Sequence, residues 1–184
     1  MPSKKIPSKE SITAQAVMET PVGLVFLCFS ATGLQRLIMA GEHEFRDGVV
    51  IGYTEETQAL PPGVLKTWHD QVAQALDDYF AGPPADFADL PLDLRGAPFH
   101  LRVWQELRKI PPGETVSYQE LARRLGNPKG SRAVGQACGA NPIPLIVPCH
   151  RVIAANGSLG GFSSGLPRKR WLLEHEQVSV GGQV

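Results

Sequence analysis

The stretch 117–151, SYQELARRLGNPKGSRAVGQACGANPIPLIVPCHR, holds most of the information on how this chain folds. Ser117 followed three positions later by Glu120 is a capping box, and it predicts that a helix begins there. The turn residues at 126–130 break this helix, and Arg132–Ala140 predicts a second short one. Two short helices joined by a tight glycine-containing turn form a helix-turn-helix candidate, although many purely structural helix pairs show the same pattern.

The second predicted helix is built from small side chains. Its small residues are Ala133, Gly135, Ala137, Cys138, Gly139 and Ala140. Glycine weakens helices and small side chains bury little area, so a helix that packs in a core usually avoids this composition. The long cation Arg132 among these small side chains favours a nucleic-acid-binding surface, and close helix-helix packing is the alternative.

The five residues Val147-Pro148-Cys149-His150-Arg151 place a potential nucleophile beside a potential base. Pro148 fixes one backbone torsion and biases Val147 toward an extended conformation, so we expect Cys149 on a stiff, extended segment. An isolated cysteine beside apolar residues is otherwise most often a small buried hydrophobe. A Cys-His pair is also typical of cysteine hydrolases, so these five residues alone leave several chemistries open.

Three β-like runs lie in the N-terminal half, at Ile12–Val17, Leu24–Phe29 and Leu34–Met39. Turn residues separate them, so they predict an antiparallel meander. Cys28, in the middle run, is expected to be a core residue of its strand.

Three further helices are predicted from apolar residues at helical spacing. The first lies between Val64 and Phe80 and ends at Gly82-Pro83-Pro84. The second runs from Phe99 to Ile110 and is closed by prolines and a glycine. The third, near the end of the chain, has Pro167 at a plausible first helical position.

These elements indicate a mixed α/β (α+β) fold in two domains. We expect an N-terminal α/β domain at 11–90 with a small antiparallel sheet, and a C-terminal, mostly helical domain at 98–176 with the helix-turn-helix and an active-site loop. Proline, glycine and aspartate crowd the connection between them, so 91–97 is the predicted linker. Flexible tails are expected at 1–10 and 177–184.

Charge differs between the two halves. Residues 1–97 contain 7 Lys+Arg and 13 Asp+Glu, whereas residues 98–184 contain 11 and 5. A basic C-terminal half fits attraction of a polyanion to that part of the chain alone.

The cysteines and the apolar runs exclude several classes of protein. Cys28, Cys138 and Cys149 are odd in number and widely separated, which argues against a disulfide framework or a zinc site. No apolar stretch has the length of a signal-peptide core or of a membrane span. A reducing cytoplasm is therefore the expected compartment.

Six motifs, in order and in spacing, resemble the O6-alkylguanine-DNA alkyltransferases. They are Ser117–Glu120, Gly126–Lys129, Arg132–Gly135, Asn141-Pro142, Pro148–Arg151 and Trp171–Glu176. The resemblance is strong from about Pro98 to Glu176 and weak in the N-terminal half, for which it implies a ribonuclease-H-like domain. It implies a DNA repair protein, a single-turnover methyltransferase that moves an alkyl group from guanine O6, and often thymine O4, onto its own cysteine.

The resemblance implies that Cys149 is the alkyl acceptor, that His150 deprotonates it through a water, and that Glu176 orients and charges this histidine. A thiolate suits the reaction, because displacement at an sp3 carbon needs a soft, strong nucleophile. Neighbours on an extended segment point to opposite sides, so a bridging water is expected. By resemblance Asn141 ties the helix pair to the active-site loop, and it also fits a helix C-terminal cap. Arg151 is expected to bond to backbone within its own loop.

The target base must leave the duplex, because an O6 substituent inside the stack is hidden from a cysteine in a pocket. The resemblance implies that Arg132 fills the vacated space from the minor groove. It implies that Tyr118 crowds the neighbouring phosphate and donates to the flipped base. Gln119 and Asn127 are further expected contacts with DNA. Without the resemblance, the tyrosine and the arginine would be ordinary residues on a helix-pair surface.

The glycine-rich segment Ala154–Gly165 resembles the substrate-binding loop of the family. The resemblance implies that Phe162 lines the pocket and that Ser163 offers a backbone donor toward O6, where negative charge grows as the alkyl group leaves. Ala155 is a further expected substrate contact. Some relatives carry tyrosine at the position of Phe162.

No cofactor and no metal are expected, because the cysteines and histidines do not supply the zinc pattern of animal relatives. The expected partner is double-stranded DNA containing O6-alkylguanine, contacted through the minor groove. No membrane association is expected. We expect a monomer in the cytoplasm, associated with the nucleoid if the source is bacterial, and cooperative binding along DNA stays open. Two other functions also stay open: a non-reacting binder of alkylated DNA, which Cys149 argues against, and a helix-turn-helix regulator that reads sequence.

Overall fold

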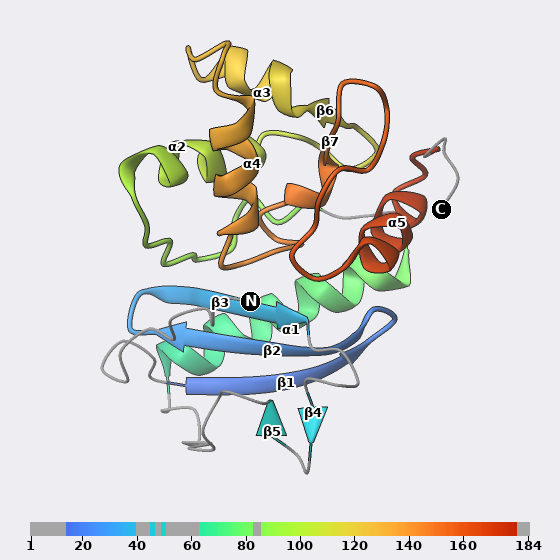
Figure 1. Ribbon diagram of the computed structural model, residues 1–184. Coiled ribbons are helices and arrows are strands. Elements are labelled where there is room, and N and C mark those ends of the chain that lie inside the picture. The colour runs from blue at the N-terminus through green and yellow to red at the C-terminus, as the bar shows by residue number, and fades with distance from the viewer. Residues whose placement is uncertain (1–13, 40–44, 47–48, 51–62, 83–85, 180–184) are drawn as a thin grey trace.

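The computed structural model describes residues 14–39, 45–46, 49–50, 63–82 and 86–179. The expected N-terminal tail and the last residues of the expected C-terminal tail lie outside these ranges. A small sheet with one long helix forms one part of the molecule, and the remaining helices form the other (Figure 1). This is the mixed α/β architecture that the sequence predicts.

The sheet is the predicted antiparallel meander. Strands β1 (Ala14–Thr20), β2 (Gly23–Ser30) and β3 (Gly33–Met39) lie in the order β1-β2-β3. Both pairs are antiparallel, and the register of the β2–β3 pair shifts between Cys28 and Phe29. Cys28 is a core residue as expected, and burial, partly opposed by the charge of Arg36, raises its pKa to about 11.

Helix α1 (Val64–Ala81) packs on this sheet, and its end reaches the other part of the molecule (Figure 1). Val72, Leu76 and Tyr79 are fully buried, and their spacing of four and three residues puts them on one helix face. The sequence therefore predicts both the helix and the face that it buries.

Four helices build the C-terminal part. They are α2 (Pro98–Leu107), α3 (Tyr118–Arg124), α4 (Ser131–Gly139) and α5 (Leu166–His175). Ser117 caps α3 as predicted, because its Oγ accepts from the backbone N–H of Glu120 at 3.0 Å. Trp104 of α2 donates its indole N–H to the carbonyl oxygen of Ala137 at 2.9 Å, which holds α2 against α4. None of the helices in the described ranges has both the length and the apolar character that a membrane crossing demands.

Two pairs of very short strands complete the described structure. Strands β4 (Phe45–Arg46) and β5 (Val49–Val50) pair antiparallel. Strands β6 (Val116–Ser117) and β7 (Val152–Ile153) pair parallel. The second pair matters for the site, because it joins the start of α3 to the residues that follow Cys149.

The connection between the two parts runs along the edge of β3. The backbone N–H of Leu34 donates to Pro91 at 2.8 Å, and the N–H of Asp93 donates back to Leu34 at 2.8 Å. Farther along the strand, the N–H of Leu37 donates to the carbonyl oxygen of Pro142 at 3.0 Å. Strand β3 therefore holds both the predicted linker and the segment that leads to Cys149.

Replacing Gly33 tests this packing. An added Cβ at Gly33 would lie 2.5 Å from the carbonyl oxygen of Pro91, and Gly33 has a φ of 152°. We expect Gly33→Ala to lower the free energy of unfolding by about 1–3 kcal/mol in urea denaturation. Gly139→Ala is the control, because this helical glycine has open space around its Cβ position and should be neutral or stabilising. Equal effects of the two substitutions would contradict the packing of the linker on β3.

Candidate active site and DNA-binding surface

Cys149, His150 and Arg151 form one turn of 3-10 helix, and all three side chains are buried. The expectation of an extended segment is therefore wrong at these residues. The N–H of Cys149 donates to Val147 at 2.8 Å and that of Arg151 donates to Pro148 at 3.1 Å, so local hydrogen bonds curl the backbone into a turn. Proline suits the start of such a turn, because it has no N–H to leave unpaired.

Asn141 holds the chain on both sides of this turn. Its Nδ2 donates to the carbonyl oxygen of Val147 at 2.7 Å and contacts the Sγ of Cys149 at 3.1 Å, while its Oδ1 accepts from the N–H of Ile143 at 3.0 Å. Leu145, between these partners, has a φ of 77°, an unfavourable conformation for a leucine. The buried amide thus stabilises a strained loop and directs the thiol of Cys149.

His150 and Glu176 form a buried pair at the base of the site. The Nε2 of His150 lies 2.9 Å from the Oε1 of Glu176, and neither side chain is exposed to solvent. Burial alone raises the pKa of Glu176, but hydrogen bonds from His150 and Arg151 outweigh it and bring this pKa down to about 2. An ionised carboxylate only accepts hydrogen bonds, so Nε2 of His150 is the donor.

The other ring nitrogen of His150, Nδ1, is in a different situation. Burial lowers the pKa of His150, against the hydrogen bond and the charge of Glu176, which raise it. A neutral histidine that carries its proton on Nε2 has a lone pair on Nδ1. Nδ1 is buried and makes no hydrogen bond with any residue that the structure describes. It is therefore placed to accept a proton.

Arg151 also binds Glu176, which the sequence analysis missed. Its Nε donates to Oε2 at 2.9 Å and its Nη2 donates to Oε1 at 2.8 Å, while its Nη1 donates to the carbonyl oxygen of Ile110 at 2.6 Å. The expectation of backbone bonds within its own loop is wrong, because a buried guanidinium needs a carboxylate partner more than another carbonyl. Tyr79 of α1 adds a further donor to Oε1 at 2.8 Å.

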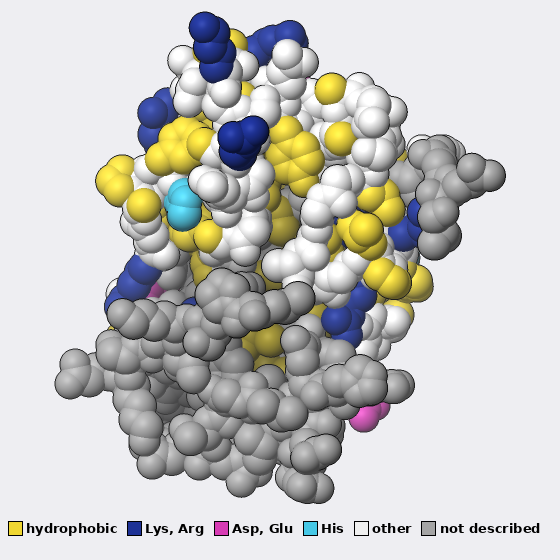
Figure 2. All heavy atoms as spheres, viewed as in Figure 1, with side chains coloured by type: hydrophobic (Ala, Val, Ile, Leu, Met, Phe, Trp, Pro, Cys, Tyr) yellow, Lys and Arg dark blue, Asp and Glu magenta, His cyan; other side chains and the backbone are white. Residues whose placement is uncertain are grey.

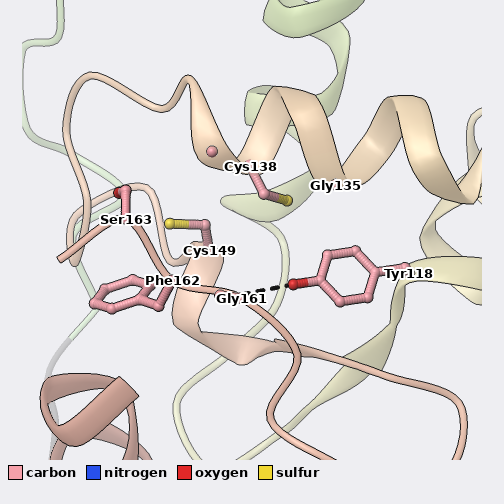
Figure 3. Close-up of a pocket in the computed structure, with 8 residues that line it drawn as sticks. Tyr118, Gly135, Cys138, Cys149, Gly161, Phe162 and Ser163 are labelled. Carbon is pink, nitrogen blue, oxygen red and sulfur yellow. Dashed lines mark hydrogen bonds between the residues drawn. The ribbon is translucent and has the colours of Figure 1, made fainter. Parts of the chain in front are cut away.

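A cavity of about 110 Å³ opens above Cys149. Its lining residues are Tyr118, Gly135, Cys138, Gly139, Cys149, Gly161, Phe162 and Ser163. Figure 3 shows the side chains of Cys149, Phe162 and Tyr118 around this space, contributed by the 3-10 turn, the glycine-rich segment and the start of α3. The structure thus brings four of the expected site residues, Tyr118, Cys149, Phe162 and Ser163, to one pocket.

The glycine-rich segment lies close against Tyr118. The hydroxyl of Tyr118 donates to the carbonyl oxygen of Gly161 at 3.4 Å, and burial raises the pKa of this tyrosine. An added Cβ at Gly160 would lie 2.9 Å from the ring of Tyr118, and Gly160 has a φ of 67°. Only glycine fits both the conformation and the contact, so the segment and the tyrosine form one wall of the pocket.

Lys169 also binds the glycine-rich segment. This lysine of α5 is fully buried and donates to the carbonyl oxygens of Val152 (2.6 Å), Leu159 and Gly161 (3.2 Å). Burial lowers its pKa to about 8, while Cys149 acts in the opposite direction. The sequence does not predict this burial, because a lysine in a basic helix normally faces solvent.

The other residues expected to contact DNA or substrate do not line the pocket. Gln119 is on α3, Asn127 is in the turn, Arg132 is on α4, and Ala155 is in the glycine-rich segment, and all four are exposed. On the face seen in Figure 2, Lys and Arg side chains predominate over Asp and Glu in the C-terminal part. Helix α4 carries small pocket residues on one side and Arg132 at its start, so close packing and an exposed surface occur on one helix.

The chain is similar to known proteins in both sequence and fold. Residues 98–178 match the family described as 6-O-methylguanine DNA methyltransferase, DNA binding domain. The chain is 42% identical over 160 residues to the methylated-DNA–protein-cysteine methyltransferase of Mycolicibacterium paratuberculosis, with 87% of this chain and 90% of the relative covered. It is 49% identical over 125 residues to the enzyme of that name from Salmonella typhimurium, with 68% of each covered.

The chain belongs to the methylated-DNA–protein-cysteine methyltransferase family. A solved structure of Mycobacterium tuberculosis OGT in complex with DNA is similar to it, with 40% identity, a TM-score of 0.72, and coverage of 90% of this chain and 93% of that one. The O6-methylguanine-DNA methyltransferase of Pyrococcus kodakaraensis is 26% identical with a TM-score of 0.60, and 89% of this chain and 99% of that one are covered. The fold class expected from the sequence is confirmed.

The buried carboxylate predicts an acid-sensitive stability. Glu176 ordinarily titrates near 4.5 and its pKa in the folded protein is about 2, so the unfolded chain takes up this proton first as the pH falls. The stabilisation is complete above about pH 4.5 and is lost as the pH falls toward about 2. Its loss lowers the free energy of unfolding by on the order of 3 kcal/mol.

Glu176→Gln should flatten this part of the pH dependence of unfolding, followed by urea denaturation between about pH 2 and 4.5. Glu174→Gln is the matched control, because Glu174 lies two residues earlier and is exposed. A variant at 176 whose stability falls with acid as steeply as that of the wild type would contradict the assignment.

Proposed function

We propose that this protein repairs alkylated DNA by direct reversal. It takes the alkyl group from O6 of a guanine, or O4 of a thymine, that has been flipped out of the duplex, and keeps it on Cys149. One observation carries the proposal: the Cys149 thiol lines an open pocket, while the His150–Glu176 pair is fully buried beside it with the Nδ1 of His150 available as an acceptor. Family membership supports the same reaction.

The proposed chemistry balances without any cofactor. His150 takes the proton of the Cys149 thiol through a water, and the charge of Glu176 stabilises the imidazolium that forms. The thiolate attacks the alkyl carbon, so an S–C bond forms while the C–O6 bond breaks and its electron pair stays on the base. Tyr118 and the backbone of Ser163 are proposed donors to the base as that charge grows. The product is a thioether with no hydrolytic release step, so each molecule acts once.

The exposed face of α3 and α4 is the proposed DNA surface. Arg132 is proposed to enter the minor groove and replace the extruded base in the stack, with Gln119, Asn127 and Ala155 contacting the DNA around it. The Lys and Arg side chains of the C-terminal part supply attraction to phosphates. The structure of the Mycobacterium tuberculosis relative in complex with DNA supports double-stranded DNA as the partner.

We also propose two domains, at 11–90 and 98–176, joined by the linker 91–97. The first is proposed to support the second through β3 and α1. Because DNA is the substrate and the thiol must stay reduced, we propose that the protein acts in the cytoplasm, at the nucleoid if the source is bacterial. A monomer suffices for this chemistry, since one chain supplies the thiol, the base and the carboxylate.

Mass spectrometry tests the alkyl acceptor. After incubation with duplex DNA that contains O6-methylguanine, one methyl group should appear on the peptide that carries Cys149. Cys149→Ala should abolish transfer and keep DNA binding, because the phosphate contacts lie elsewhere. Cys28→Ala is the control and should transfer normally, since Cys28 is a core residue of the sheet. No adduct under saturating DNA, or an adduct on another residue, would refute the proposal.

Arg132→Ala tests base flipping. Stacking of a side chain against bases contributes ~1–3 kcal/mol, so repair of duplex DNA should slow roughly 10- to 100-fold. Transfer from the free alkylated base should be spared, because no base has to be extruded. Arg124→Ala removes the same charge from an exposed position on α3 and should have a much smaller effect in both assays. An unchanged rate on duplex DNA in Arg132→Ala would show that another residue supports flipping.

A further inference from the structure

Helix α1 reaches the buried carboxylate of the active site. Tyr79 lies in its last turn, is fully buried, and donates its hydroxyl to the Oε1 of Glu176 at 2.8 Å. The two residues are 97 positions apart, and Tyr79 lies outside the matched region 98–178. In Figure 1 the end of α1 lies beside α5, at whose end Glu176 is found.

We propose that Tyr79 is a positioning residue for the alkyl transfer, whose hydroxyl fixes the Glu176 carboxylate and limits how strongly that carboxylate attracts the proton of His150. The inference rests on the proposed function, in which His150 accepts the proton of Cys149. It makes the N-terminal part of the chain a contributor to the chemistry in addition to a support for the fold.

The phenol of Tyr79 is held so that its hydroxyl has one orientation. The ring packs against Phe87 at 5.3 Å and against His175 at 5.1 Å between centroids, and its edge contact with Phe80 is at 5.1 Å. The Nε2 of His175 also lies 2.6 Å from the backbone oxygen of Tyr79. These contacts fix the helix end and the ring together, so the hydroxyl meets Glu176 without a large loss of side-chain freedom.

Tyr79 shares one oxygen with His150. The Oε1 of Glu176 lies 2.8 Å from the Tyr79 hydroxyl, 2.9 Å from the Nε2 of His150 and 2.8 Å from the Nη2 of Arg151. Each donor disperses part of the carboxylate charge, so each one weakens the hold of this oxygen on the others. Removing the tyrosine hydroxyl therefore makes Glu176 a stronger partner for His150.

Three other charged groups also act on His150. Arg151 of the 3-10 turn and Lys169 of α5 both oppose a positive charge on His150, and Glu176 favours it. Burial, with the charge and hydrogen bond of Glu176, raises the pKa of Tyr79 far above its usual value, so the phenol stays a neutral donor. A change at Tyr79 alone thus alters a single contribution to the proton affinity of His150.

The direction of the effect follows from these charges. A stronger acceptor at Oε1 stabilises the imidazolium form, so the pKa of His150 rises. His150 must be neutral to accept the proton of Cys149, so the acid limb of the pH–rate profile moves to higher pH. A residue that only filled space would change the stability of the protein without moving this limb.

The test uses the full chain and single-turnover transfer from duplex DNA containing O6-methylguanine, measured across the acid range. Tyr79→Phe keeps the ring and should move the midpoint of the acid limb upward by about half to one pH unit. Site-specific replacement of Tyr79 with 3-fluorotyrosine, a stronger donor, should move it downward. Phe87→Leu is the matched control: it loosens the packing of the same ring, keeps the hydroxyl, and should lower thermal stability with the midpoint unchanged.

An unmoved acid limb in Tyr79→Phe, with normal transfer by the wild type, would overturn the inference and leave the proposed function intact. An equal shift in Phe87→Leu would also overturn it, because packing alone would then explain the effect. Absence of a methyl group on Cys149 in the wild type would instead refute the proposed function. If thermal unfolding showed that Tyr79→Phe does not fold, the fluorotyrosine protein, which keeps the hydroxyl, would provide the test. A downward shift of its acid-limb midpoint supports the inference, and an unchanged midpoint overturns it.

Discussion

The burial of one carboxylate, Glu176, sets the conditions that the rest of the structure must meet. A buried charge costs several kcal/mol of desolvation unless donors surround it, and the side chain of Glu176 is fully buried. The donors come from separated parts of the chain: His150 and Arg151 from the 3-10 turn, and Tyr79 from α1. Arg151 also binds the carbonyl oxygen of Ile110, so the turn that follows α2 joins the same network. The ionised carboxylate of Glu176 therefore binds donors from both parts of the molecule.

Within the described residues this network fixes His150 and leaves its Nδ1 without a hydrogen-bond partner. The carboxylate orients His150 through Nε2, and Asn141 directs the sulfur of Cys149 while it stabilises the strained loop around Leu145. The ring of Phe162, which lines the pocket, lies edge-on to His150 at 6.5 Å between centroids. A site that reacts once gains from such rigidity, because no second substrate has to be admitted and no product has to be released from the sulfur.

Periodicity and capping predict the larger elements well, because those signals are local. The apolar spacing within 64–80 gives α1, and Ser117 begins α3 where its hydroxyl caps the helix. The contact of Tyr79 with Glu176 could not be predicted, since no local pattern relates residues that are 97 positions apart. Lys169 was missed because burial of a lysine depends on carbonyl groups supplied by distant loops. The motif Pro148–Arg151 predicts which residues react. The 3-10 turn and the two-residue strands are too short to show a periodic pattern in the sequence.

The protonation state of His150 decides whether the buried pair can accept the proton of Cys149. Nitrogen-15 NMR of the histidine side chains, assigned with a His150→Gln variant, distinguishes the two neutral tautomers from the imidazolium. We expect a neutral ring at pH 7 with the proton on Nε2, bound to Glu176, and an unprotonated Nδ1. A proton on Nδ1, or an imidazolium at pH 7, would contradict it, because the buried pair would then hold no base to accept the proton of Cys149.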